Sequence, residues 1–122
     1  MVEVICDTNF LIHLATRRIL NLDRIELEIG QLKFLVPIVV EFELNKLKNV
    51  PSKELDIKKT LEFIKKFKKI QIFGTFADDE IVKYIKLKKS FIGTMDKKLK
   101  KLIKNHGGLV ISFNNDKLVL ET

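Results

Sequence analysis

The chain has 122 residues, of which 46% are hydrophobic and 32% are charged, and its formal net charge is +7. This length and composition predict one folded domain over residues 1–122 and argue against two ordinary domains or a disordered chain. No apolar run approaches the ~20 residues that cross a bilayer, and Glu3 and Asp7 interrupt the start of the chain, where a signal peptide would be apolar.

The first part of the chain alternates between strand and helix patterns. Residues 2–7 predict a strand that is buried on both faces, and residues 9–20 predict an amphipathic helix. A short helix at 23–30 and a strand at 33–36 follow, and the next helix occupies 37–47, with a proline in its first turn.

The second part of the chain continues this alternation. Its predicted elements are, in order, a helix at 53–69, a strand at 70–73, a helix at 78–88, a strand at 90–94, a helix at 97–105, a strand at 109–113 and a last short strand at 117–121. Strands that alternate with helices predict a doubly wound, mostly parallel α/β sheet flanked by helices. Ligands of such sheets bind beyond the carboxyl ends of the strands, where the winding direction reverses.

Two acidic residues lie where predicted strands end. Asp7 ends the first strand, and Asp96 follows the fourth strand in the segment GTMDKKL. Each of them also suits a cap of the helix that follows it. The single cysteine, Cys6, cannot form an internal disulfide, so we expect it to be a small core residue of a cytoplasmic protein.

A third acid, Glu43, lies on the apolar side of a predicted helix. At ~100° per residue, Glu43 falls near the centre of an apolar stripe, whereas Glu41 falls on the opposite side. The stripe consists of Val39, Val40, Phe42, Leu44 and Leu47. A carboxylate that faces a core without a partner costs several kcal/mol. Glu43 therefore needs a lysine such as Lys46 or Lys97, a metal ion or a water-filled cleft.

The helix at 78–88 contributes a fourth acid. Asp78 lies one turn before Ile81 and Val82 on the inward face of this helix, whereas Asp79 lies to one side. Helical phase therefore favours Asp78 over Asp79 as a site residue. The position of Asp78 at the helix start also suits an ordinary first-turn acid that stabilises the helix.

Asp7, Glu43, Asp78 and Asp96 together predict a cation site. Carboxylates that share one pocket repel one another and raise their own pKa values unless a cation neutralises them. A site made only of carboxylates suits the hard ions Mg²⁺ and Mn²⁺. Beside a lysine-rich surface, such a site suits hydrolysis of a phosphodiester.

Twenty of the 23 basic residues are lysines, and they cluster at 65–69, 83–89 and 97–105. A positive field of this kind favours a polyanion, either a nucleic acid or an anionic surface. A lysine-rich surface that only keeps the protein soluble explains the same pattern equally well. Tyr84 and exposed phenylalanines suit base stacking, although most of the phenylalanines suit the core.

The acidic segments resemble the four motifs of PIN-domain nucleases, in the family's order and over nearly the whole chain. VICDTNFLI resembles the first motif, VPIVVEFELNKLKN the second, ADDEIV the third and GTMDKKLKKLIKNHGG the fourth. The sequence looks most similar to small archaeal VapC-like proteins and to PIN proteins of ribosomal RNA processing.

This resemblance implies a five-stranded sheet in the order 3-2-1-4-5 and a ribonuclease that depends on Mg²⁺ or Mn²⁺. The metal ligands and catalytic acids it implies are Asp7, Glu43, Asp78 and Asp96. Thr8 and Asn9 would shape the loop that aims Asp7, Thr94 would hydrogen-bond near the metal or scissile phosphate, and Asp79 is the alternative third-motif acid. The lysines expected to guide the RNA backbone are Lys83, Lys86, Lys97, Lys98 and Lys100.

The resemblance also implies partners and leaves alternatives open. RNA is the expected partner, with a homodimer through the 53–69 helix and, for a VapC-type toxin, an antitoxin protein; no membrane contact is expected. A phosphatase of the HAD type would need a second acid at Asn9, and a receiver domain would need an aspartate where the third strand ends in Ile72 and Phe73. A PIN domain that binds RNA or acts as a scaffold without catalysis stays a possible alternative.

Overall fold

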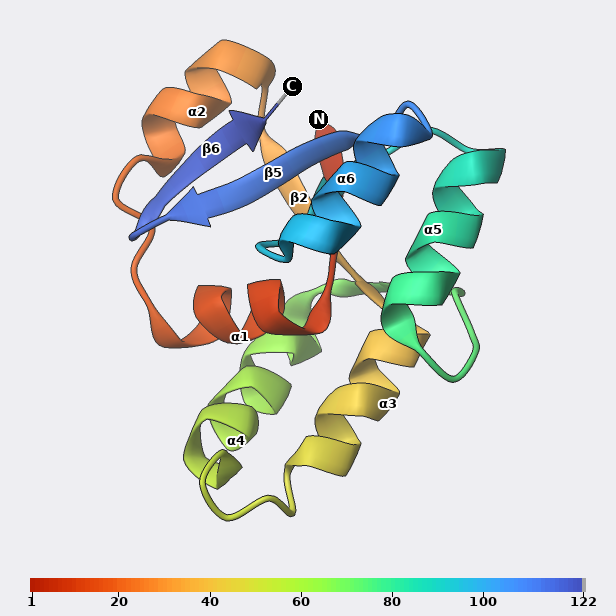
Figure 1. The fold of residues 1–122 in the computed structure, drawn as a ribbon. Helices are drawn as coiled ribbons and strands as arrows, with labels where there is room; N and C mark the ends of the chain where they lie inside the picture. Colours follow the sequence, from red (N-terminus) through yellow and green to blue (C-terminus); the bar gives the residue numbers. More distant parts are fainter. Residues whose placement is uncertain (122) are drawn as a thin grey trace.

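A six-stranded sheet in the order β3-β2-β1-β4-β5-β6 forms the centre of the computed structural model, which describes residues 1–121 (Figure 1). The strands are β1 (Val2–Cys6), β2 (Leu32–Pro37), β3 (Lys68–Ile70), β4 (Phe91–Gly93), β5 (Leu109–Asn114) and β6 (Lys117–Glu121). The first five are parallel, and β6 runs antiparallel to β5. The predicted α/β sheet is confirmed, but the strand at 117–121 extends it from five strands to six.

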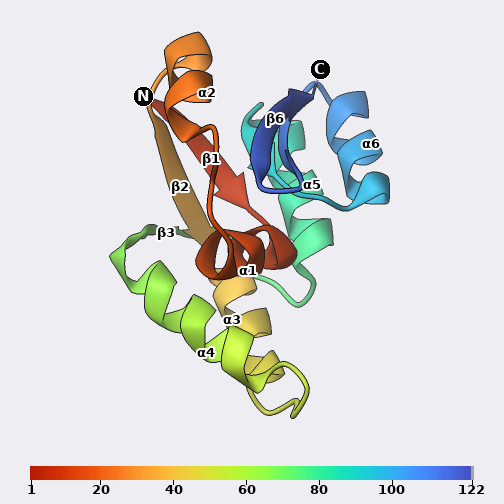
Figure 2. The same ribbon diagram turned by 90° about the vertical axis from the view of Figure 1, so that its left-hand side faces the viewer.

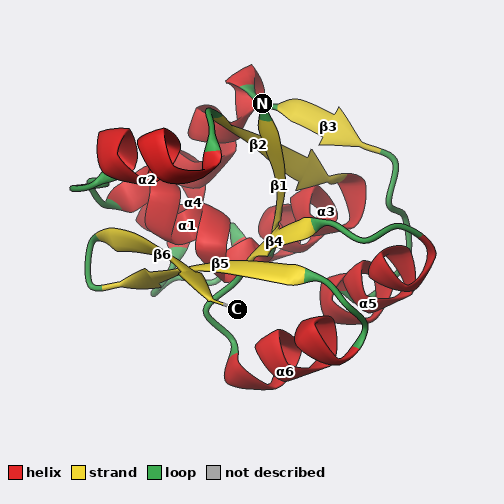
Figure 3. Ribbon diagram, turned by 90° about the horizontal axis from the view of Figure 1, so that it is seen from above, coloured by secondary structure: helices red, strands yellow, loops and turns green. Residues whose placement is uncertain are grey.

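Helices cover both faces of this sheet. They are α1 (Thr8–Thr16), α2 (Leu22–Ile29), α3 (Ile38–Leu47), α4 (Glu54–Phe63), α5 (Ala77–Leu87) and α6 (Lys97–Asn105). Figure 3 shows α1, α2 and α4 on one side of the sheet and α5 and α6 on the other. In Figure 2, α3 and α4 lie beyond the carboxyl ends of β1 and β2. No helix within residues 1–121 is long and apolar enough to cross a bilayer.

The core explains why β1 is apolar over residues 4–6, whereas Glu3 at its beginning is exposed. Val4, Ile5 and Cys6 are all buried, because helices cover both faces of a parallel sheet. Phe10 of α1 is also fully buried, and its ring fills the space beside Gly93, where a Cβ atom would lie 2.7 Å away. The absence of a side chain at Gly93 therefore lets the start of α1 approach β4 closely.

The helix predicted over 9–20 ends early, at Thr16. The backbone N–H of Leu20 donates to the carbonyl of Asp116 at 2.9 Å. The side-chain amide of Asn21 donates to the carbonyl of Leu118 at 2.9 Å and accepts from the Leu118 N–H at 2.8 Å. These bonds tie the chain after α1 to the β5–β6 hairpin, and they replace the bonds that a longer helix would make.

The segment 53–73 also differs from its predicted boundaries. The helix predicted over 53–69 ends at Phe63 and passes into the short 3₁₀ turn Ile64–Lys66, and the strand predicted at 70–73 is instead Lys68–Ile70. Strand β3 pairs with β2 so that Lys68 lies opposite Leu35. This long-range register determines where the strand begins, and hydrophobic periodicity does not report it.

Candidate metal centre

A cleft with a volume of about 230 Å³ lies at the carboxyl edge of the sheet. Its lining residues are Asp7, Thr8, Asn9, Glu43, Phe76, Ala77, Asp78 and Asp96. They come from the end of β1 with the start of α1, the middle of α3, the start of α5 and the start of α6. The cleft therefore brings together the four acids singled out in the sequence, whereas Asp79 lines an adjacent groove.

Asp7 is 5% exposed and holds the start of α1. Its Oδ1 accepts a hydrogen bond from the Phe10 N–H at 2.8 Å, so Asp7 caps this helix. Its Oδ2 accepts a hydrogen bond from the hydroxyl of Thr94, which follows β4. Because β1 and β4 are parallel neighbours, the two residues that follow them reach the same point at the edge of the sheet.

Thr94 connects Asp7 to Asp96. The Thr94 side chain is fully buried, and its hydroxyl accepts the Asp96 N–H at 3.1 Å while it donates to Asp7. The Oδ1 of Asp96 accepts the Leu99 N–H at 2.8 Å and caps α6. Asp7 and Asp96 thus act as helix caps and at the same time line the cleft.

Glu43 points from α3 into the cleft and joins three elements. Its Oε1 accepts the hydroxyl of Thr8 at 2.7 Å, and its Oε2 accepts the N–H of Ala77, the first residue of α5, at 2.7 Å. Glu41 faces away and pairs with Lys69. Within residues 1–121, no basic nitrogen lies within 4.0 Å of the Glu43 carboxylate, so the expected alternative of an ion pair with a lysine is wrong.

The pKa values of Asp7 and Asp78 are raised, chiefly by burial and further by neighbouring carboxylates. Burial is the main cause that raises the pKa of Asp7 from 3.8 to about 6; hydrogen bonds from Thr94 and Phe10 oppose this rise, and the charges of Asp78 and Asp96 add to it. Asp78 is exposed as a residue, but its carboxyl group is partly buried, and this burial raises its pKa. Repulsion from Asp96, Glu43 and Asp79 raises the pKa of Asp78 further.

The comparisons with known proteins agree with this geometry. The sequence matches the family model of the PIN-like domain over residues 4–115. The chain belongs to the PIN-like domain family. Fifteen chains of solved structures match it, and among these is the PIN domain endonuclease Utp24, with 28% identity and a TM-score of 0.77 over 98% of this chain and 90% of that one. No curated protein matches the sequence. The resemblance drawn from the four motifs is therefore confirmed.

The donor set of this PIN-like domain suits a hard divalent cation in its chemistry. All candidate ligands are carboxylates, and each carboxylate keeps free lone pairs beside the hydrogen bonds described above. Among residues 1–121, however, no group of three His, Cys, Asp or Glu side chains is close enough to hold a metal ion. Asp78 accepts no hydrogen bond from the described chain, whereas Asp7, Glu43 and Asp96 each accept backbone or hydroxyl donors.

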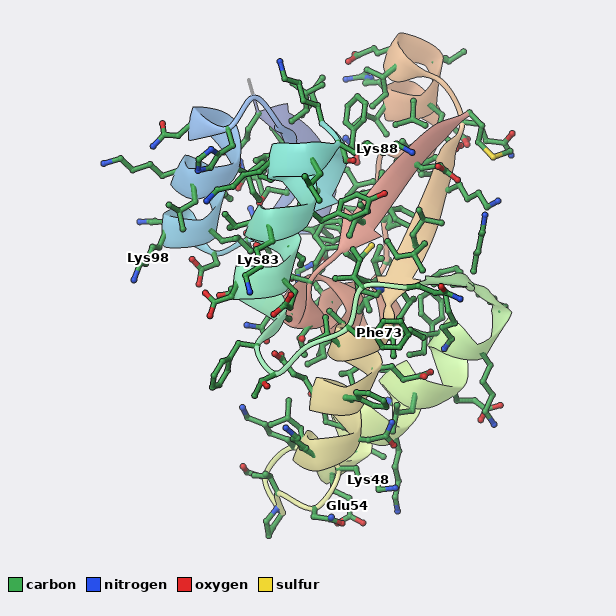
Figure 4. The ribbon with its side chains drawn as sticks, turned by 90° about the vertical axis from the view of Figure 1, so that its right-hand side faces the viewer. Lys48, Glu54, Phe73, Lys83, Lys88 and Lys98 are labelled. Carbon is green, nitrogen blue, oxygen red and sulfur yellow. The ribbon has the colours of Figure 1, made fainter. Side chains whose placement is uncertain are left out.

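The predicted RNA-contacting lysines of the PIN-like domain lie in different surroundings. Lys98 is exposed, and its charge opposes the rise in the pKa of Asp78. Figure 4 shows Lys98 of α6 and Lys83 of α5 on the same side of the molecule. Lys97 and Lys100 line another hollow beside α6, and Lys100 lies 2.7 Å from Glu121. The charge of Lys100 is therefore largely neutralised within the protein.

Two parts of the cleft's surroundings in the PIN-like domain were not expected from the sequence. Phe76, which is 65% exposed, lines the cleft and the adjacent groove. The sequence feature that could have indicated it is an aromatic residue at the start of a helix, where a polar capping residue is favoured. A second hollow of about 450 Å³ continues from the cleft past Asn9 and includes His13 and Arg17, whose side chains lie 3.6 Å and 3.5 Å from Asp116. A larger hollow of about 630 Å³ beside α2 shares no lining residue with the cleft.

Proposed function

We propose that this PIN-like domain is an endoribonuclease that hydrolyses RNA phosphodiester bonds with Mg²⁺ or Mn²⁺. One observation carries the proposal: the carboxylates of Asp7, Glu43, Asp78 and Asp96 reach one cleft from separate segments, and none is paired with a basic side chain within the described chain. Family membership and the likeness to a PIN domain endonuclease support it.

In this proposal, Asp7, Asp78 and Asp96 hold the metal ion and Glu43 completes the acidic set. A bound divalent ion would activate water and stabilise the negative charge that develops on the phosphate. Thr94 and the Phe10 amide orient the Asp7 carboxylate, and Thr8 orients that of Glu43. We favour Asp78 over Asp79 as the third ligand, because only Asp78 lines the cleft.

Cleavage of a mixed RNA pool tests this function. We expect cleavage with Mn²⁺ or Mg²⁺, none in EDTA, and a loss of at least about 100-fold in Asp7→Asn and Glu43→Gln, because each change removes a carboxylate from the cleft. Glu41→Gln is the matched control: it removes an acid from the outer side of the same helix, and we expect it to retain activity. Cleavage that persists in EDTA and in Asp7→Asn would contradict the proposal.

A second candidate is a PIN domain that binds RNA, or acts as a scaffold in ribosome biogenesis, without cutting. It is favoured by the hydrogen bonds through which Asp7, Glu43 and Asp96 hold helix starts, which give these acids a purely structural use. It is also favoured by the lack of a preformed group of three ligands within residues 1–121. RNA binding by the wild-type protein without cleavage under any metal condition would select this candidate.

If the protein cuts RNA, we propose that its biological role is that of a VapC-like toxin or of an RNA-processing nuclease. For a toxin, induced expression would arrest growth, Asp7→Asn would relieve the arrest, and an antitoxin encoded by a neighbouring gene would suppress it. For a processing enzyme, none of these effects is expected.

We also propose a homodimer through α4, where Leu55 is 67% exposed. Native mass spectrometry of the wild type and of Leu55→Lys tests this proposal, and an unchanged monomer in both would reject it.

A further inference from the structure

A groove of about 440 Å³ adjoins the acidic cleft, between α5 and α6. Its lining residues are Thr75, Phe76, Asp79, Glu80, Val82, Lys83, Lys86 and Leu102. Phe76 lines this groove and the cleft as well. Phe76 is therefore shared by the two hollows, and it precedes Asp78 by two residues at the start of α5.

The fold itself gives little reason for phenylalanine at position 76. Phe76 is the N-cap of α5, a position that favours Ser, Thr, Asp or Asn, and it makes no side-chain capping bond. Glu43 satisfies the first N–H of this helix instead, through Ala77. The ring is also 65% exposed, so it contributes little to the core. A single exposed aromatic residue is ordinary on a protein surface. Phe76 suggests a binding role because it lines both the cleft and the groove.

Lysines accompany this ring along the groove. Lys83 and Lys86 of α5 line it, and Lys98 lies one turn before Leu102 on the same face of α6, at the end nearest the cleft. Glu80 lies 3.6 Å from Lys83 and neutralises part of its charge. Within residues 1–121, Lys86 and Lys98 have no acidic partner within 4.0 Å and stay available to phosphates.

We infer that Phe76 stacks on a base next to the scissile phosphate, while Lys83, Lys86 and Lys98 contact the backbone of single-stranded RNA in the groove. This inference rests on the proposed nuclease function. An aromatic ring stacks on any base whose face is free, and lysines track the phosphates beside it. The bases of a duplex already cover one another, so a strand held by Phe76 must be unpaired at that nucleotide. Phe76 thereby selects unpaired RNA over duplex RNA.

Tryptophan fluorescence tests this stacking directly, because the chain contains no tryptophan. Phe76→Trp places a single reporter at the proposed contact. Phe73→Trp is the matched control, since Phe73 is 58% exposed in the same loop but lines neither hollow (Figure 4). Both variants are prepared with Asp7→Asn to prevent cleavage and are titrated in Mg²⁺ with a short oligouridine RNA and with the same RNA annealed to oligoadenosine.

We expect single-stranded RNA to quench Trp fluorescence at position 76 and not at position 73, and duplex RNA to quench neither. We also expect Phe76→Ala to weaken binding of single-stranded RNA about tenfold, and Phe73→Ala to leave it unchanged. Both positions are exposed, so these variants should keep the fold, which circular dichroism checks.

Four outcomes would overturn the inference, and they separate it from the function proposed above. Equal quenching at both positions, or binding that Phe76→Ala leaves unchanged, rejects stacking while metal-dependent cleavage by the wild type still stands. Absence of RNA binding, together with absence of cleavage, rejects both. Fluorescence at position 76 that changes with protein concentration without RNA indicates a protein contact and rejects RNA as the occupant.

Discussion

At the scale of single residues, the buried carboxylate of Asp7 lowers the stability of the folded protein near neutral pH, where the proposed function needs its negative charge. Its carboxyl has a pKa of about 6, raised from 3.8 chiefly by burial. The unfolded chain therefore gives up this proton more readily than the folded chain does. As pH rises from about 4 to about 6, we expect ionisation of Asp7 to lower the free energy of unfolding, and above this window the contribution of Asp7 to this loss amounts to about 3 kcal/mol.

We predict that Asp7→Asn makes the metal-free protein more stable near neutral pH. The amide keeps the shape of the carboxyl, can accept from the Phe10 N–H and can donate to Thr94, and carries no charge to bury. Urea unfolding in EDTA should show a gain of about 1 to 3 kcal/mol near pH 8 and a smaller gain near pH 5. A loss of stability, or a gain that does not change with pH, would refute this explanation.

At the scale of elements, Glu43 joins α3 to the starts of α1 and α5. Glu43→Ala removes the acceptors of Thr8 and of the Ala77 N–H, so we expect the free energy of unfolding to fall by about 1 to 2 kcal/mol. Glu43→Gln can keep both contacts, with its carbonyl toward Ala77 and its amide toward Thr8. It should therefore unfold close to the wild type in urea.

The two Glu43 variants separate the effect of its hydrogen bonds on stability from the effect of its charge on RNA cleavage. Both should lose RNA cleavage, although only the alanine variant should lose stability. If Glu43→Gln cleaves RNA like the wild type, the carboxylate is needed only to hold the helices together. Equal losses of stability in the two variants would mean that the hydrogen bonds described here contribute little.

At the scale of the whole molecule, the net charge of +7 is distributed over several surfaces, and we expect only one of them to bind RNA. Replacing three lysines of the groove region by glutamine should reduce the salt dependence of RNA binding, with a fall of about 2 in the log–log slope. The variant carries Lys83→Gln, Lys86→Gln and Lys98→Gln. The measurement is fluorescence anisotropy with single-stranded RNA over a series of salt concentrations.

A control with the same net charge tests whether location matters. It replaces three other exposed lysines by glutamine, namely Lys48, Lys53 and Lys59, which precede or belong to α4. Figure 4 shows Lys48 at the end of α3 that lies far from Lys83 and Lys98 in this view. We expect its salt slope to match that of the wild type. An equal fall in slope for both triple variants would mean that only the overall charge attracts RNA.

Local patterns predicted much of the cleft. Asp7 and Asp96 follow neighbouring parallel strands, so their shared edge follows from the winding of the sheet. Glu43 and Asp78 lie on the inward sides of helices, which helical phase reports from a few neighbouring residues. The place of Phe76 beside the cleft was not predictable in this way, because Glu43, which accepts the first N–H of its helix, lies far away in the sequence.

The sequence by itself determined the fold class and which four acids line the cleft. Hydrophobic period, helical phase and strand ends are properties of short segments, so the sequence reports them directly. Only the tertiary structure decided where α1 and β3 end, which carboxylates cap which helices, and that Lys100 is paired with Glu121. These features depend on hydrogen bonds and ion pairs between distant segments. No local pattern contains them, since each requires the position of a partner that is fixed only when the chain folds.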